Sequence, residues 1–156
     1  MTVHFPYSVA DESLLEPIPS RYCRDQKVHR LLPSALQAFE TMAKAAEQEG
    51  VFLIVYSAFR NFEFQRLLFE DAEQRHGKGM GSVWVAPPGH SEHHTGEVVD
   101  IGDGDFPDCD DESTFETTPA CAWLFANAQR FGFKLSFPPN NPQGIGYEPW
   151  HWRFIA

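Results

Sequence analysis

The chain has 156 residues, of which 42% are hydrophobic and 22% charged, and this length and composition are typical of one globular domain. Its formal net charge of -10 argues against a nucleic-acid partner and against adhesion to an anionic membrane surface. No segment approaches the run of about 18 apolar residues that spans a bilayer, and we expect a monomer.

The N-terminal segment carries no visible export signal. Its first 19 residues include Asp11, Glu12 and three prolines, where a leader would have a basic stretch followed by an apolar one. A chain that is complete as given is therefore expected to be cytoplasmic. Removal of a leader would instead place the protein in the cell envelope or periplasm.

The three cysteines do not form a recognisable framework. Cys23, Cys109 and Cys121 are odd in number and lack the Cys-x-x-Cys spacing of a cysteine-based zinc site. A bridge between Cys109 and Cys121 is conceivable, but the pattern favours free thiols.

The first half of the chain predicts two helices around one buried strand. Residues 1–31 look irregular and are expected to wrap over the domain. A helix is predicted over 33–49, because Pro33 suits a first helical turn and apolar residues recur at three- and four-residue steps until Gly50. Residues 51–56 (VFLIVY) predict a buried strand. A second helix, capped by Asn61 and ending near His76, is predicted to turn these side chains inward: Phe64, Leu67, Leu68 and Ala72.

The second half predicts short strands around a third helix. Residues 97–101 read as a strand, and the seven carboxylates within 103–116 predict a solvated loop. Thr118 and Pro119 predict the start of a helix that ends before Gly132. Further strands are predicted at 133–137 and at 146–155, the latter interrupted by a proline. With no repeat and no linker, we predict a single α+β domain over residues 1–156.

Two short segments concentrate residues that bind metals. The first is Ser91-Glu-His-His-Thr-Gly-Glu-Val-Val-Asp100, and the second is Glu148-Pro-Trp-His151. Zinc prefers histidine nitrogen and carboxylate oxygen, and a catalytic zinc has three protein ligands and a water. His93, Asp100 and His151 supply such a set, which leaves Glu148 as a base for the water.

The spacing of these residues requires bends in the backbone. His93 and Asp100 are seven residues apart, and Glu148 and His151 are three apart, so neither pair can share one face of a regular strand. Gly96 permits a turn between the first two, and Pro149 favours a bend between the others.

The pattern indicates amide hydrolysis. A water on zinc has a pKa of about 7 and is therefore available as a nucleophile at neutral pH. Glu148 would take its proton and pass it to the leaving amine. Arg60, just after the buried strand, is the natural cation to stabilise charge on the carbonyl oxygen.

The combination of motifs resembles the VanY-type D-alanyl-D-alanine carboxypeptidases, a group of zinc peptidases that also includes D-Ala-D-Ala dipeptidases and phage endolysins. The resemblance covers roughly residues 30–156. It rests on these segments: Ser57-Ala-Phe-Arg60 with Gln65, Pro88-Gly-His-Ser-Glu-His-His-Thr-Gly96, Asp100-Ile101, the 123–137 stretch, and Tyr147-Glu-Pro-Trp-His-Trp-Arg153.

The resemblance implies a fold and a set of roles. The fold is a small antiparallel sheet with helices packed on it and a zinc site in a cleft on the sheet, as in the hedgehog and D-Ala-D-Ala peptidases. One zinc ion is bound by His93, Asp100 and His151, with Glu148 as general base and Arg60 polarising the scissile carbonyl. Substrate-lining positions are implied for three further residues: Ser57, Gln65 and Ser91. The implied substrate is a peptidoglycan peptide or muropeptide that ends in D-Ala-D-Ala.

Several alternatives stay open at this point. The motifs are equally compatible with cleavage of an L,D bond or an internal cross-link, and with a silent zinc module that binds cell-wall peptides. Tyrosines of the relatives are replaced by four phenylalanines: Phe59, Phe62, Phe64 and Phe137. A register slip would make His94 a ligand in place of His93. Otherwise His90 and His94 are expected to line the cleft.

Overall fold

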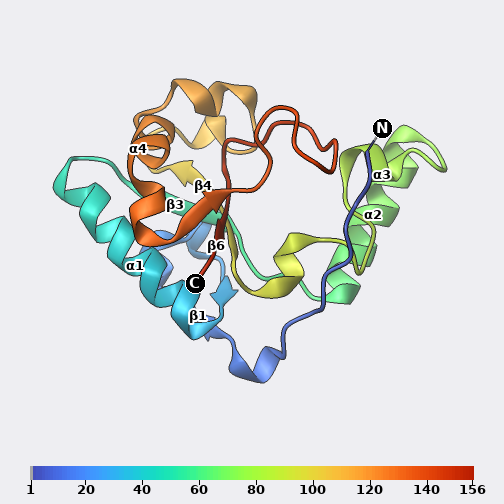
Figure 1. The fold of residues 1–156 in the computed structure, drawn as a ribbon, viewed down its shortest axis with the longest axis horizontal. Helices are drawn as coiled ribbons and strands as arrows, with labels where there is room; N and C mark the ends of the chain where they lie inside the picture. The colour runs from blue at the N-terminus through green and yellow to red at the C-terminus, as the bar shows by residue number, and fades with distance from the viewer. Residues whose placement is uncertain (1) are drawn as a thin grey trace.

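A four-stranded sheet lies at the centre of the computed structural model, which describes residues 2–156 (Figure 1). Its strand order is β3-β4-β6-β5, and every neighbouring pair is antiparallel. The strands are β3 (Leu53–Ser57), β4 (Val98–Asp103), β5 (Phe133–Leu135) and β6 (His151–Phe154). The prediction of an α+β fold with a small antiparallel sheet is therefore confirmed.

Strand β4 separates the hydrophobic core from the functional face. All six of its residues are buried, between β3 on one edge and β6 on the other. Because successive residues of a strand point to opposite faces, Val99 and Ile101 enter the core. Asp100, between them, points to the other face, where it lines a cleft.

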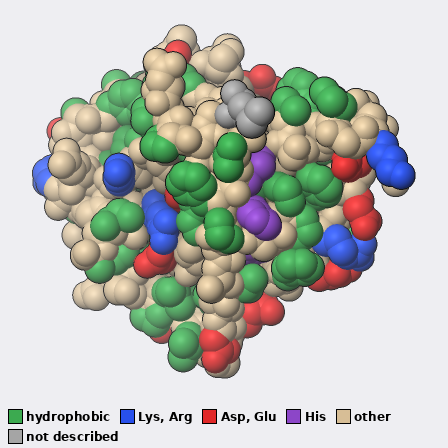
Figure 2. Space-filling model, turned by 45° about the vertical axis from the view of Figure 1, so that its right-hand side comes forward, with side chains coloured by type: hydrophobic (Ala, Val, Ile, Leu, Met, Phe, Trp, Pro, Cys, Tyr) green, Lys and Arg blue, Asp and Glu red, His purple; other side chains and the backbone are tan. Residues whose placement is uncertain are grey.

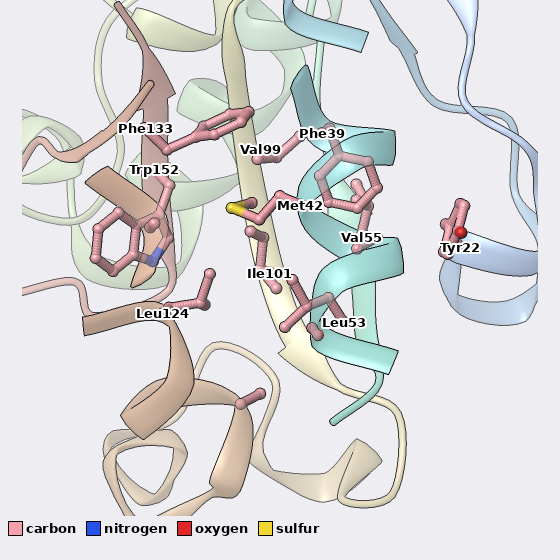
Figure 3. Packing of buried hydrophobic residues seen from close by; sticks show 14 of the residues in the cluster. Tyr22, Phe39, Met42, Leu53, Val55, Val99, Ile101, Leu124, Phe133 and Trp152 are labelled. Atoms are coloured by element: carbon pink, nitrogen blue, oxygen red, sulfur yellow. The ribbon is translucent and has the colours of Figure 1, made fainter. Parts of the chain in front are cut away.

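Helix α1 (Pro33–Gln48) covers the core face of the sheet. It begins at its proline, as predicted, and its buried stripe includes Phe39 and Met42, which are completely buried. Figure 3 shows Met42 reaching toward Val99 and Ile101 of β4, and the ring of Phe39 packs against Tyr22 with 5.7 Å between the ring centroids. A stripe with helical spacing thus meets a strand with two-residue spacing.

Helix α4 (Pro119–Asn127) also packs on the core face and is followed by the 3₁₀ turn η7 (Ala128–Phe131). Thr118 caps it, because its hydroxyl accepts a hydrogen bond from the backbone N–H of Cys121. Gly132 ends the turn with a φ of 90° in the left-handed region. The helix and its two boundaries agree with the sequence prediction.

Helix α2 (Phe62–His76) is where the predicted orientation is wrong. Asn61 caps it as expected, accepting the N–H of Phe64. However, Phe64 and Leu67 are 52% and 53% exposed, and the buried residues of this helix are Gln65 and Ala72. The helix stands beside the cleft, apart from α1 and α4, and is followed by the short helix α3 (Gly81–Trp84) (Figure 1). Its apolar stripe therefore does not face the core.

Two strand predictions are too long. The third helix leads into β5, which ends at Leu135. The last strand, predicted from residue 146, begins only at His151. Pro149 has no N–H to donate to a ladder, and the chain before β6 is a turn in which the N–H of His151 bonds the carbonyl of Glu148 at 3.3 Å.

The N-terminal residues carry short elements where the sequence predicted an irregular wrap. Strands β1 (Glu16–Pro17) and β2 (Arg30–Leu31) form a separate antiparallel pair. Three 3₁₀ turns accompany them: η1 (Glu12–Leu14), η2 (Ser20–Tyr22) and η3 (Arg24–Gln26).

The acidic segment 103–116 is only partly solvated, which corrects the prediction of a free loop. It contains the turns η5 (Pro107–Cys109) and η6 (Ser113–Thr117). Asp110 pairs with Arg24 at 2.8 Å, and Asp103 is 2% exposed. A buried carboxylate requires hydrogen bonds, and Asp103 accepts them from the backbone N–H groups of Asp105 and Ala120, both at 2.9 Å.

Two further observations concern the chain as a whole. Between residues 2 and 156, no helix combines the length and apolar character needed to cross a membrane. Cys23, Cys109 and Cys121 are all free, in agreement with the sequence prediction.

We predict that Asp103→Ala destabilises the protein by about 1–3 kcal/mol, because the N–H groups of Asp105 and Ala120 lose their acceptor and the second of them is buried in the first turn of α4. Equilibrium unfolding in urea measures this cost. The control is Asp108→Ala, which removes an exposed carboxylate of the same segment. Equal unfolding midpoints for both variants would contradict the capping role.

Candidate metal centre

Three potential ligands converge on the cleft face of the sheet. His93 lies in the 3₁₀ turn η4 (Glu92–Thr95), Asp100 lies in β4, and His151 is the first residue of β6. Asp100 and His151 are direct cross-strand partners. One ligand atom from each residue lies within 4.8 Å of the others, and each residue is at most 5% exposed.

Gly96 provides the bend that the spacing requires. It ends η4 with a φ of 71°, and a Cβ there would approach Leu15 and Leu32 at 3.0 Å. The chain then enters β4, which brings Asp100 to His93. The Nε2 of His93 lies 3.2 Å from Oδ2 of Asp100.

Hydrogen bonds fix which nitrogen of each imidazole faces the carboxylate. The Nδ1 of His93 lies 2.7 Å from the carbonyl oxygen of Ala58, which can only accept, so this nitrogen carries the proton and Nε2 is left as a donor atom for a metal. The Nε2 of His151 lies 2.9 Å from Oε1 of Glu92, and its Nδ1 lies 3.2 Å from Oδ1 of Asp100. Histidines that bind metals are commonly oriented in this way.

The residues fit one zinc ion. Oδ1 of Asp100 is buried and has no hydrogen-bond partner among the described residues, so the three side chains leave one polar atom that a cation would satisfy. Within residues 2–156 no fourth histidine, cysteine or acidic residue completes the cluster. Two nitrogens and one oxygen with an open fourth position match a catalytic zinc site, whereas a structural site is closed by four protein ligands.

Burial and neighbouring charges shift the pKa values of the three cluster residues in different directions. Burial and the positive charge of Arg60 lower the pKa of His93 to about 4, so this ring is neutral at pH 7. Burial would also lower the pKa of His151, but the neighbouring carboxylates of Asp100 and Glu92 raise it to about 10. Burial alone would raise the pKa of Asp100, and the neighbouring imidazoles outweigh it and hold the pKa below its ordinary value.

Glu92 is a functional residue that the sequence reasoning did not single out. It is 8% exposed, and its Oε1 accepts hydrogen bonds from His151 and from the hydroxyl of Ser136 at 2.7 Å. Burial alone would raise the pKa of Glu92, but these hydrogen bonds and Arg153 lower it to about 2. Glu92 therefore stays ionised and orients the His151 ring. Its only signal in the sequence is its place beside His93.

The cluster lies at the base of a cleft of about 440 Å³. Figure 2 shows histidine side chains in a hollow on this face, with hydrophobic side chains on both sides of it. The residues predicted as catalytic or substrate-binding all line the same cleft as the three potential ligands: Ser57, Arg60, Gln65, Ser91 and Glu148. The sequence prediction therefore placed these residues in one region.

Comparison with known proteins agrees with this geometry. The family model described as D-alanyl-D-alanine carboxypeptidase (VanY) matches residues 28–156, which is most of the chain. The chain belongs to the VanY family. The predicted family resemblance is thereby confirmed, and His93, Asp100 and His151 all lie within the matched residues.

Curated VanY-family relatives are longer than this chain. A carboxypeptidase from Bacillus subtilis, YodJ, is 32% identical over 146 residues, covering 92% of this chain and 50% of its own length. A D-alanyl-D-alanine carboxypeptidase from Enterococcus faecium is 29% identical over 168 residues, covering 100% of this chain and 50% of its own length. The chain thus spans about half the length of these relatives.

Solved VanY-type structures share the fold. VanYB in complex with D-alanine-D-alanine is 27% identical with a TM-score of 0.76, covering 100% of this chain and 86% of that one. The LD-carboxypeptidase LdcB is 31% identical with a TM-score of 0.74, covering 81% and 60%. A variant of VanY in complex with Zn(II) is 26% identical with a TM-score of 0.71, covering 96% and 87%. The Zn(II) complex belongs to that relative; in this chain the His/Asp/His cluster is the group of residues that could hold such an ion.

Arg60 lies beside the ligands of this VanY domain. Its Nη2 is 3.6 Å from Oδ2 of Asp100, its Nε donates to the hydroxyl of Ser57 at 3.0 Å, and its Nη1 is 3.5 Å from Oε1 of Gln65. Gln65 is itself fixed, because its Nε2 donates to the carbonyl of Ala86 at 2.9 Å. The guanidinium therefore has a defined position in the cleft.

Ser91 has a structural contact as well as a place in the cleft. Its hydroxyl accepts the N–H of His93 at 3.2 Å and so caps η4, the turn that carries this ligand. Ser91 is therefore a capping group of η4, and this contact does not exclude contact with substrate.

His94 is neither a ligand nor a cleft residue, which corrects the expectation that it lines the site. It is completely buried, its Nδ1 donates to the carbonyl of Arg60 at 2.8 Å, and its Nε2 accepts the N–H of Gly89 at 3.0 Å. Both of its nitrogens are used in holding the loops together. His90 does line the cleft.

We predict that Glu92→Ala weakens zinc binding by about 10–100-fold, because His151 loses the carboxylate that orients it. Competition with a chromophoric chelator measures the affinity. Glu92→Gln, which keeps an acceptor oxygen but no charge, is expected to fall between this variant and the parent protein.

The matched control for Glu92 is Glu97→Ala. Glu97 also pairs with Arg153, at 3.0 Å, but it does not touch a ligand. Zinc affinity equal to that of the parent protein in Glu92→Ala would show that His151 needs no such partner.

Proposed function

We propose that this chain is a zinc-dependent D,D-carboxypeptidase that hydrolyses the terminal D-Ala-D-Ala bond of peptidoglycan peptides. The observation that carries the proposal is the three-ligand cluster with an open fourth position, placed in one cleft with Glu148 and Arg60. Relatives named D-alanyl-D-alanine carboxypeptidases and the VanYB complex with D-alanine-D-alanine support this choice of substrate. Because one chain supplies every residue of the site, we propose that it acts as a monomer.

Glu148 is the proposed general base. When bound, zinc supplies a Lewis acid and lowers the pKa of a coordinated water to about 7. The Glu148 carboxylate accepts a proton from the attacking water and then donates it to the nitrogen of the leaving D-alanine. Burial and the charges of Asp100 and Asp111 raise the pKa of Glu148 to about 7, against the opposing charges of His151 and Arg60. A carboxyl group with this pKa can exchange its proton in both directions near neutrality.

Arg60 is the proposed electrophile. Negative charge develops on the carbonyl oxygen as its carbon becomes tetrahedral, and a cation held in place stabilises that charge without having to reorganise. Hydrogen bonds to Ser57 and Gln65 hold the guanidinium in the cleft. Gln65 and Ser91 complete the polar lining for the substrate backbone and its carboxylate.

An L,D-carboxypeptidase is the second candidate. The similarity to LdcB, with 31% identity and a TM-score of 0.74, is as strong as that to VanYB. Phe64 and Phe137, where relatives often carry tyrosine, line the cleft, so this wall presents rings without hydroxyl groups. Peptides that differ only in the chirality of the residue before the scissile bond decide between the two candidates. Faster release of D-alanine from the L,D peptide would overturn the D,D assignment.

We predict that Glu148→Gln keeps its zinc but loses hydrolysis by about 100-fold or more, since Glu148 is outside the ligand cluster and an amide cannot accept the proton. D-Alanine release and metal content are measured on the same sample. The control is Glu112→Gln, an exposed glutamate in the acidic segment. Unchanged turnover with bound zinc would remove Glu148 from the mechanism, and loss of zinc would make it a ligand.

We also predict that kcat/KM falls about tenfold per pH unit on the acidic side, because only the ionised Glu148 accepts a proton. The raised pKa, about 7, sets the upper limit for the midpoint of this fall. Bound zinc adds positive charge and moves the midpoint lower, toward the ordinary value for glutamate. A pH profile of D-alanine release gives the midpoint. A profile that is flat through this range, or a fall that persists in Glu148→Gln, would contradict the assignment.

A further inference from the structure

An N-terminal strap, residues 2–10, runs along the cleft although it lies outside the segment matched by the family model. In Figure 1 this blue segment descends between helices α2 and α3 on one side and the loop that precedes β6 on the other. Thr2, His4 and Tyr7 of the strap line the same cleft as the metal ligands. The strap is therefore part of the wall of the proposed active site.

The strap is fixed to the loop before β6 through Gln143. The backbone N–H of Val3 donates to the Gln143 carbonyl at 2.7 Å, and that of Phe5 donates to its Oε1 at 2.8 Å. The Nε2 of Gln143 donates to the hydroxyl of Tyr7 at 3.0 Å. Gln143 is only 7% exposed, and its own N–H donates to Oδ1 of Asn141, so the anchor is held in place.

The strap is also hydrogen-bonded to the opposite side of the cleft. The Nε2 of His4 donates to the carbonyl of Ser82 in α3 at 2.7 Å. The backbone N–H of Tyr7 donates to the carbonyl of Gly89 at 2.9 Å, in the loop that leads to the ligand His93. Neighbouring residues of one short segment thus bind both sides of the cleft. A segment that is hydrogen-bonded to both sides of the cleft closes the space between them.

We propose that the strap is the end wall of the cleft and restricts hydrolysis to the last peptide bond of a substrate. This inference rests on the proposed peptidase function. With the strap in place, the space beyond the metal admits a short residue after the scissile bond and stops a longer chain. The part of the peptide that precedes the scissile bond can extend only through the open side of the cleft. The strap then determines an exopeptidase specificity that the ligand cluster itself does not impose.

The first test compares two substrates of the unaltered, zinc-loaded chain. One is the pentapeptide L-Ala-γ-D-Glu-L-Lys-D-Ala-D-Ala, and the other is the same peptide extended by Gly-Gly. Expressed as a ratio of kcat/KM values, we expect at least about a 100-fold preference for the shorter peptide. Equal cleavage of the D-Ala-D-Ala bond in both peptides would overturn the end wall and leave the peptidase function intact. Cleavage of neither, with zinc bound, would instead contradict the proposed function.

The second test loosens the strap with the double variant His4→Ala/Gln143→Ala. Loss of both anchors is expected to raise the relative rate on the extended peptide by about tenfold or more, while the metal content stays at one zinc per chain. The control is Ser8→Ala, an exposed strap residue, which should leave the ratio of the two rates unchanged. An unchanged ratio in a folded, zinc-loaded double variant would overturn the proposal. If the double variant does not fold, the single variant His4→Ala and the substrate comparison decide.

Discussion

The candidate metal centre of this protein depends on the antiparallel pairing of β4 with β6, which sets Asp100 directly opposite His151. Side chains of directly opposed residues lie on the same face of a sheet, so this register alone brings two of the three ligands together. A shift of β6 by one residue would turn His151 into the core while Asp100 stayed on the cleft face. The register is held by the residues on the other face, where Val99 and Trp152 are buried in the hydrophobic core (Figure 3). One face of the β4–β6 pair therefore packs in the core, and the other face sets the geometry of the metal centre.

Sequence reasoning named the three residues that the structure brings together, but it could not identify what orients them. Zinc prefers the residue types of His93, Asp100 and His151. The glycine and the proline near them indicate the bends that bring them together. Glu92 was not assigned a role, because its partner His151 is 59 residues away and a carboxylate beside a histidine has no pattern of its own. The contact arises only from the three-dimensional pairing of η4 with the start of β6.

The error on helix α2 has a related cause. An apolar stripe at helical spacing indicates one hydrophobic face, but it does not say what that face meets. For α1 the stripe meets the sheet, and Phe39 is completely buried. For α2 the helix stands beside the cleft, so Phe64 is half exposed and lines it. Apolar surface that sequence periodicity assigned to the core thus forms the wall of a proposed peptide site.

The carboxylates around the site differ in pKa because their surroundings differ. Glu92, hydrogen-bonded to His151 and Ser136, has a pKa of about 2 and remains a fixed negative charge. Asp100, between two imidazoles, also keeps its charge, as a metal ligand must. Glu148 lacks such donors, and burial beside other carboxylates raises its pKa to about 7. Of these three groups only Glu148 has its pKa raised, so its surroundings as well as its place in the motif support the proposed proton-transfer role.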